Sequence, residues 1–112
     1  MVLEIKREID QLWEEHLAIR EKKKGCLATP QKERALSLMR ELARKEGEEG
    51  KQWVGKKIVE IRRRLARIDQ EEGDFETAAL QLQKAQQFLD RHPEFERLNL
   101  KRIVRRSADE VG

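Results

Sequence analysis

The chain has 112 residues, of which 42% are charged, 38% hydrophobic and 4% aromatic, and its formal net charge is +3. This length suits one domain that can fold without a metal or a disulfide. The few aromatic residues disfavour a β-rich fold, and the net charge alone is too small to indicate a nucleic-acid ligand. No apolar run approaches the roughly 18 residues that a membrane span needs.

The single cysteine, Cys26, cannot form an internal disulfide, which favours a reducing compartment. The sequence does not open with a basic and then apolar leader. These observations predict a cytoplasmic protein that is not inserted in a membrane.

The first two predicted helices each carry one apolar side. Residues 3–23 form the first, whose apolar positions step by three and four: Ile5, Ile9, Leu12, Trp13, His16, Leu17 and Ile19. Thr29 and Pro30 suit the N-cap and the first position of the second helix. The apolar side of that helix comprises Ala35, Leu38, Met39, Leu42 and Ala43. The glycines of the run 47–50 then predict its end or a bend.

The next two predicted helices are joined by a tight turn. The third covers about residues 51–71, with apolar positions at Val54, Ile58, Ile61, Leu65 and Ile68. Gly73 closes this helix and Asp74 caps the fourth, which runs to about residue 91. The fourth helix places these residues on one side: Phe75, Ala78, Leu82, Ala85 and Leu89.

A fifth predicted helix occupies residues 93–108 and turns Leu100, Ile103 and Val104 inward. We therefore predict an all-α fold of about five antiparallel helices, in a compact bundle or a short array of helical repeats. The predicted domain covers residues 1–112. It would comprise an N-terminal hairpin (3–47), a second hairpin (51–92) and the C-terminal basic helix.

Small residues in the second hairpin predict close helix packing. Ala78 and Ala85 leave room for a partner backbone, and Ala66 supplies a small contact on the preceding helix. The stretch "IRRRLARIDQEEGDFETAALQLQKAQQFLDRHPE" covers residues 61–94 and resembles a tetratricopeptide repeat. The resemblance places the repeat-like hairpin at residues 59–93. The matching positions are Leu65, Ala66, Gly73, Asp74, Phe75, Ala78, Leu82 and Ala85, followed by Pro93, which comes slightly later than in the family.

The match has departures, because Arg62 stands where the family has an aromatic residue and Asp69 where it has a tyrosine. No second copy precedes it, so a generic tight hairpin is the alternative. If the resemblance holds, it implies a peptide-facing stripe on the first helix of the hairpin. Its positions fall on Glu60, Arg63, Arg67 and Gln70, and Lys56 extends this partner-binding stripe at the same helical spacing.

Catalytic chemistry is not indicated by the sequence. His16 lies on an apolar face and is interpreted as a structural histidine. Cys26 and His92 have no metal-ligand spacing, and the carboxylates are interspersed with basic residues. We expect no catalytic, cofactor or metal site, no small-molecule substrate, and therefore no enzyme.

Basic residues gather in two segments, while acids concentrate near residues 46–49 and 69–76. The residues that would contact phosphates are Lys51, Lys57, Arg62, Arg64, Lys101, Arg102, Arg105 and Arg106. A solvated helix face is the simpler interpretation of such runs. Trp53 could stack on a base, but a core or interface role is commoner for tryptophan.

Two functions fit these patterns. The first is a non-enzymatic interaction module, a small subunit or adaptor that binds a protein partner, or a second copy, through a basic helix face. The second is a nucleic-acid-binding helical subunit of a nucleoprotein complex. In size and charge alone, the protein is similar to the small subunits of RNA-guided CRISPR effector complexes.

Overall fold

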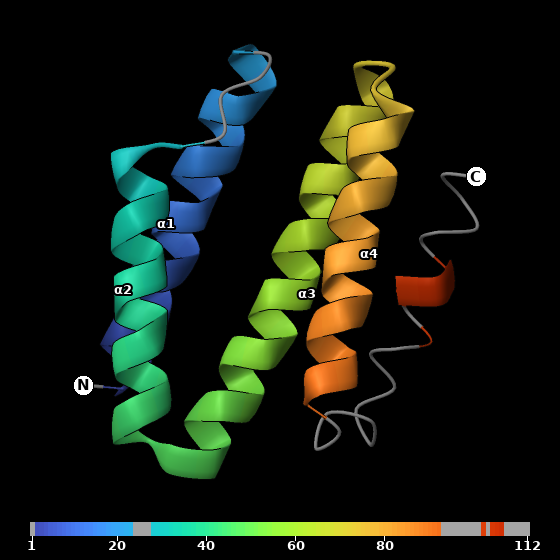
Figure 1. The fold of residues 1–112 in the computed structure, drawn as a ribbon. Coiled ribbons are helices and arrows are strands. Elements are labelled where there is room, and N and C mark those ends of the chain that lie inside the picture. The colour runs from blue at the N-terminus through green and yellow to red at the C-terminus, as the bar shows by residue number, and fades with distance from the viewer. Residues whose placement is uncertain (1, 24–27, 93–101, 103, 107–112) are drawn as a thin grey trace. The chain divides into compact units, whose positions relative to one another are not determined.

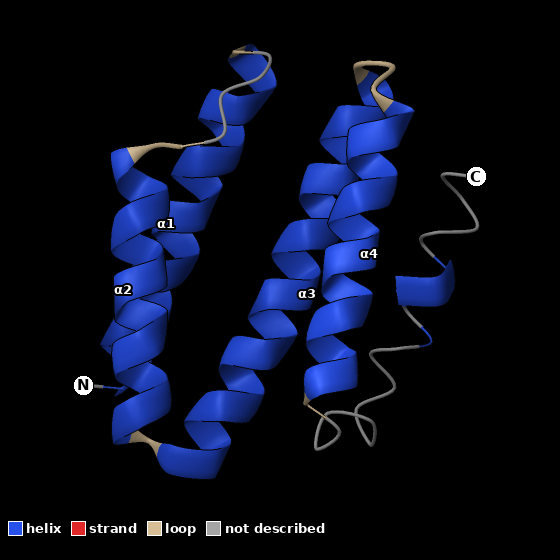
Figure 2. Cartoon of the chain, viewed as in Figure 1, coloured by secondary structure: helices blue, strands red, loops and turns tan. Residues whose placement is uncertain are grey.

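The computed structural model of this protein describes residues 2–23, 28–92, 102 and 104–106. These residues are helical apart from short turns, and no strand occurs among them, as Figure 1 and Figure 2 show. The fold is therefore all-α, as the sequence predicted.

The first compact unit, Met1–Val54, is built on helices α1 (Val2–Lys22) and α2 (Pro30–Lys45). They lie antiparallel and side by side (Figure 1). Most of the predicted apolar positions are buried, namely Ile9, Trp13, Leu17, Ala35, Leu38, Met39 and Leu42. The indole Nε1 of Trp13 donates a hydrogen bond to Met39 Sδ at 3.2 Å. Large side chains therefore fill the space between α1 and α2.

Thr29 fixes the start of α2 and connects it to α1. Its hydroxyl oxygen accepts a hydrogen bond from the Lys32 amide at 3.0 Å, which confirms the predicted N-cap. The same oxygen lies 2.8 Å from Nδ1 of His16, which is only 2% exposed. The predicted burial of His16 is therefore confirmed.

Helix α3 (Gly47–Glu71) begins earlier than predicted. The expected start near residue 51 is wrong because Gly47, in the left-handed region with φ 60°, makes the whole turn after Glu46, the C-cap of α2. Gly50 is buried within the first turns of α3. A Cβ at Gly50 would lie 2.6 Å from the Leu42 carbonyl oxygen, so only glycine fits there without a backbone shift.

The second compact unit, Gly55–Gly112, contains the rest of α3 and the antiparallel helix α4 (Phe75–Arg91). Gly73 has φ 83°, and its amide bonds to the Gln70 carbonyl while the Asp74 amide bonds to the Asp69 carbonyl. This pair of bonds defines a Schellman motif. The Asp74 carboxylate then accepts from the Thr77 amide at 3.1 Å. The predictions that Gly73 ends this helix and that Asp74 caps the next one are both confirmed.

Small residues bring α3 and α4 together. Ala66 packs with Ala78 and Leu82 in one cluster. A second cluster contains Val59, Ala85, Leu89 and Val104, with Phe88 beside it. The predicted close packing at Ala78 and Ala85 is therefore observed, since both residues are fully buried.

The inward position predicted for Phe75 is wrong, because this side chain is 54% exposed. Phe75 is the first residue of α4, and helical side chains lean towards the N-terminus. The ring therefore projects past the end of the hairpin, where no further turn of α3 covers it.

The predicted C-terminal helix is described only in part. Residues 102 and 104–106 are helical and Val104 is buried, whereas Leu100, Lys101 and Ile103 lie outside the described residues. The predicted stop of the first helix at Gly25 also lies outside them. In the described part of the protein, no helix is both long and apolar enough to cross a membrane.

Candidate functional site

The predicted partner-binding stripe lies entirely on α3 in the second unit. Lys56, Glu60 and Arg67 are exposed, whereas Arg63 and Gln70 are partly buried. Steps of four and three residues keep all five on one side of the helix. The exposed cations at 56 and 67 can therefore face one extended partner, with Arg63 between them.

Glu60 is the acid in the middle of this stripe, and it is ion-paired. Its Oε2 lies 3.2 Å from Nζ of Lys57, whose side chain is only 15% exposed. The pair partly neutralises Glu60 and holds Lys57 along the helix. Lys57 is therefore less accessible to a phosphate than the sequence suggested, and the stripe keeps a basic character.

Arg62 connects α3 to α4. Its Nη1 donates a hydrogen bond to Gln81 Oε1 at 2.9 Å. Burial lowers the pKa of the Arg62 guanidinium below its ordinary value, although an arginine remains charged near neutral pH. The side chain therefore supports the hairpin at the position where the tetratricopeptide pattern has an aromatic residue.

The other predicted phosphate contacts differ in accessibility. Arg102, Arg105 and Arg106 are exposed around the buried Val104. Lys51 is exposed but belongs to the first unit, Arg64 is partly buried, and Lys101 lies outside the described residues. The accessible cations of this set are therefore the arginines beside Val104 and the lysine at position 51.

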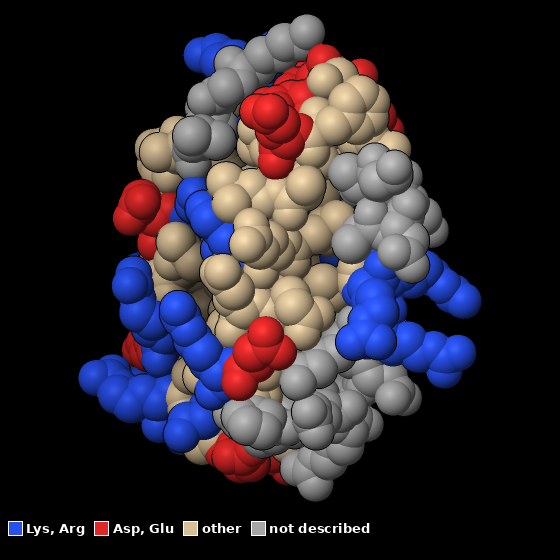
Figure 3. All heavy atoms as spheres, turned by 45° about the vertical axis from the view of Figure 1, so that its right-hand side comes forward, with Lys and Arg blue, Asp and Glu red and all other residues tan. Residues whose placement is uncertain are grey.

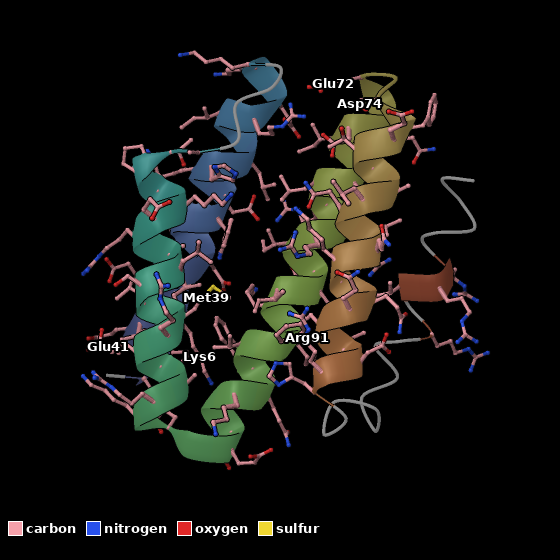
Figure 4. The ribbon with its side chains drawn as sticks, in the orientation of Figure 1. Lys6, Met39, Glu41, Glu72, Asp74 and Arg91 are labelled. Atoms are coloured by element: carbon pink, nitrogen blue, oxygen red, sulfur yellow. The ribbon has the colours of Figure 1, made fainter. Side chains whose placement is uncertain are left out.

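Charge in the second unit is separated along the hairpin. Acids surround the α3–α4 turn at Glu71, Glu72, Asp74 and Glu76. Glu72 and Asp74 are labelled at that end in Figure 4, and Arg91 lies towards the opposite end of α4. The residues next to Val104, which packs on Ala85 and Leu89, add further positive charge beside the C-terminal half of α4. The hairpin therefore has an acidic end and a basic end.

His16 and Trp53 in the first unit have local partners. Burial is the main cause that lowers the pKa of His16, and the charges of Lys32 and Arg20 lower it further. The neutral imidazole can then accept from the Thr29 hydroxyl. Nζ of Lys6 lies 5.6 Å from the centre of the Trp53 ring, within the range of a cation–π contact.

A metal site is not found in the described residues. Within them, no group of three or more His, Cys, Asp or Glu side chains could hold an ion. Cys26 lies outside the described residues.

The sequence interpretation missed the outer face of α4. Leu80 is 46% exposed, and the exposed residues around it include Ala79, Gln83 and Gln87. Between Glu76 and Asp90 the only charged residue is Lys84. In a protein that is 42% charged, this long stretch with a single charged residue was the signal that could have identified the face.

Comparisons with known proteins do not assign a family. No family model, curated protein or solved structure matches the sequence.

Proposed function

We propose that the protein is a non-enzymatic helical interaction module, a small subunit or adaptor that binds an acidic segment of a protein partner through α3. The observation that carries this proposal is the exposure of Lys56 and Arg67 on the side of α3 that also contains Arg63. Arginine side chains bind carboxylates in a two-pronged geometry that suits acidic side chains and terminal carboxylates. A cytoplasmic location is part of the proposal and is supported by the single cysteine.

The proposal includes a tetratricopeptide-like hairpin over residues 59–93. Its support is the packing of Ala66 against Ala78 and Leu82, together with the glycine turn and the aspartate cap. The hydrogen bond from Arg62 to Gln81 supplies a contact between the helices at a position that departs from the family pattern. In such a hairpin the stripe on α3 would face the bound peptide.

A nucleic-acid-binding subunit is the second candidate function. It is favoured by the exposure of Arg102, Arg105 and Arg106 on a helical segment that Val104 anchors to the second unit. Clustered arginines bind phosphates with little dependence on nucleotide sequence. This function predicts that the C-terminal arginines contribute at least as much as those of α3.

One binding experiment separates the two functions. A fluorescent oligoglutamate peptide and a generic single-stranded RNA are each titrated with the parent and with two matched variants, Arg63→Ala/Arg67→Ala and Arg102→Ala/Arg106→Ala. We expect the first variant to weaken peptide binding by roughly 10-fold or more and the second to change it little.

The nucleic-acid function predicts a different result for the same two variants. Both pairs would weaken RNA binding, and each lost charge would reduce the salt dependence of log K by about one unit. Equal losses from both pairs on RNA, with no binding of the peptide by the parent, would contradict the peptide-binding proposal.

A further inference from the structure

The outer face of α4 has a composition that no other described helix shares. Its buried side, formed by Ala78, Leu82, Ala85 and Leu89, packs within the second unit. The residues on the opposite side are three or four positions apart, namely Glu76, Leu80, Gln83, Gln87 and Arg91. All five of these residues are exposed. The centre of this face is therefore Leu80 and two glutamines, with the exposed Lys84 beside them, and an acid and a base stand at its two ends.

Figure 3 turns the right-hand side of Figure 1 forward. Uncharged residues form a broad area in this view, with acidic side chains above and below it and basic side chains at the lower right and on the left. Such an arrangement is common in surfaces that bind another protein, because the polar groups set the orientation around a less polar centre.

The face is complementary to itself when reversed. If a twofold axis passes between Gln83 and Lys84, Glu76 of one copy lies opposite Arg91 of the other, and Leu80 lies opposite Gln87. A twofold interface repeats each of these pairs. Two ion pairs and two contacts between an aliphatic side chain and an amide side chain would result, and the only like charges brought together would be those of Lys84, which lies next to the axis in both copies.

Most of the charges that flank this face follow the same acidic-to-basic order, with the exposed Asp90 as an exception at the basic end. Glu72 and Asp74 precede the acidic end of α4, and the arginines that flank Val104 lie beside its C-terminal half. In an antiparallel pair, the acidic end of each copy would lie next to the basic end of the other. A parallel pair would place like charges together at both ends.

We propose that the outer face of α4 binds the same face of a second copy in antiparallel orientation. This interface is separate from the stripe on α3 and does not depend on peptide or nucleic-acid binding. Leu80 is the one large apolar residue that the face exposes well, so the dimer is weak, reversible and salt-sensitive.

Charge reversal tests the proposed pairing. Sedimentation equilibrium of the parent at low salt is compared with that of Glu76→Arg, Arg91→Glu and the double reversal. Each single reversal places like charges opposite one another twice, so we expect the dimer dissociation constant to rise by about 10-fold. The double reversal restores the pairs and should restore association. Glu15→Arg, an exposed position on α1, serves as the control and should leave association unchanged.

A second variant tests the same pairing by adding a contact instead of removing one. Gln87→Leu would place a leucine opposite Leu80 of the other copy and should tighten the dimer, whereas Gln11→Leu on the exposed side of α1 should not. Melting curves by circular dichroism check that each variant is folded. A parent that stays monomeric at all concentrations would overturn the proposal. Equal behaviour of the double reversal and the single reversals, or of the two leucine variants, would overturn it as well.

Discussion

The hairpins of the two units are built in different ways. Large side chains fill the space between α1 and α2, and the tryptophan–methionine and histidine–threonine contacts join the two helices. Alanines at 66, 78 and 85 instead let α3 and α4 approach closely. Close packing of this kind leaves little room for substitution, whereas large interlocking side chains tolerate adjustment.

Their outer faces differ as well. The exposed positions of α1 are mostly charged, as Glu4, Arg7 and Glu8 illustrate, while the middle of α4 exposes Leu80, two glutamines and a single lysine. A heavily charged face favours solvation, and a neutral face with charged ends favours a specific neighbour. In the functions proposed above, the binding surfaces therefore belong to the second unit, and the first unit would serve as a scaffold.

The largest expected effect comes from filling the alanine contacts of the second unit. Ala78→Leu or Ala85→Leu should lower the free energy of unfolding by ~1–3 kcal/mol, because added methylenes have no space between α3 and α4. Ala79→Leu is the matched control, since Ala79 is exposed. Urea denaturation measures the difference. Equal stability of all three variants would contradict the close-packing account.

The next largest loss of stability is expected at Gly50 in the first unit, where a side chain has no room. Gly50→Ala should lower stability by about 1–2 kcal/mol, because the added Cβ meets the Leu42 carbonyl oxygen and that backbone must move. Alanine would otherwise stabilise a helical site, so a stabilised variant would refute the close approach of α2 and the start of α3.

Gly73, in the second unit, affects stability through its backbone conformation and not through lack of space. At Gly73 a Cβ meets nothing within 4 Å, but φ is 83°. Gly73→Val should therefore cost more than ~1 kcal/mol, and Gly73→Asn should cost less because asparagine tolerates this region. Thermal melting of both variants checks the order, and equal melting temperatures would show that the turn does not need a left-handed residue.

The smallest effect concerns pH and the first unit. Because the pKa of His16 is lowered in the folded protein, the unfolded protein binds more protons once the pH falls through the ordinary value of 6.5. The contribution of His16 is therefore complete above that pH and decreases below it. Urea unfolding at about pH 7.5 and about pH 5.5 should show a smaller loss of stability in His16→Gln than in the parent. An equal loss in both would mean that His16 does not titrate in this way.

Local signals in the sequence predicted most of the fold. The threonine cap, the aspartate cap, the left-handed glycine at position 73 and the apolar periodicity identified four helices, because each signal acts over a few residues. The start of α3 was missed because Gly47 and Gly50 look like helix breakers. The contact that requires Gly50 involves Leu42, and such a contact is visible only once the helices are placed.

The candidate site was predictable in part. The periodicity placed the stripe of Lys56 and Arg67 on one side of α3, but it did not show that Lys57 pairs with Glu60 or that Arg62 bonds to Gln81. These contacts depend on side-chain rotamers and on the neighbouring helix. The exposure of Phe75 was missed for a similar reason, since periodicity gives a direction around the helix and not the extent of its neighbour.

The most direct test of the central claim, that the second unit carries the binding surface, is to map the bound peptide by NMR. Amide shifts of the labelled protein are followed during titration with the oligoglutamate peptide. We expect the largest shifts on α3 around Lys56, Arg63 and Arg67, and small shifts on α1 and α2. Dominant shifts on α1 and α2, with those around Arg63 unchanged, would contradict the account.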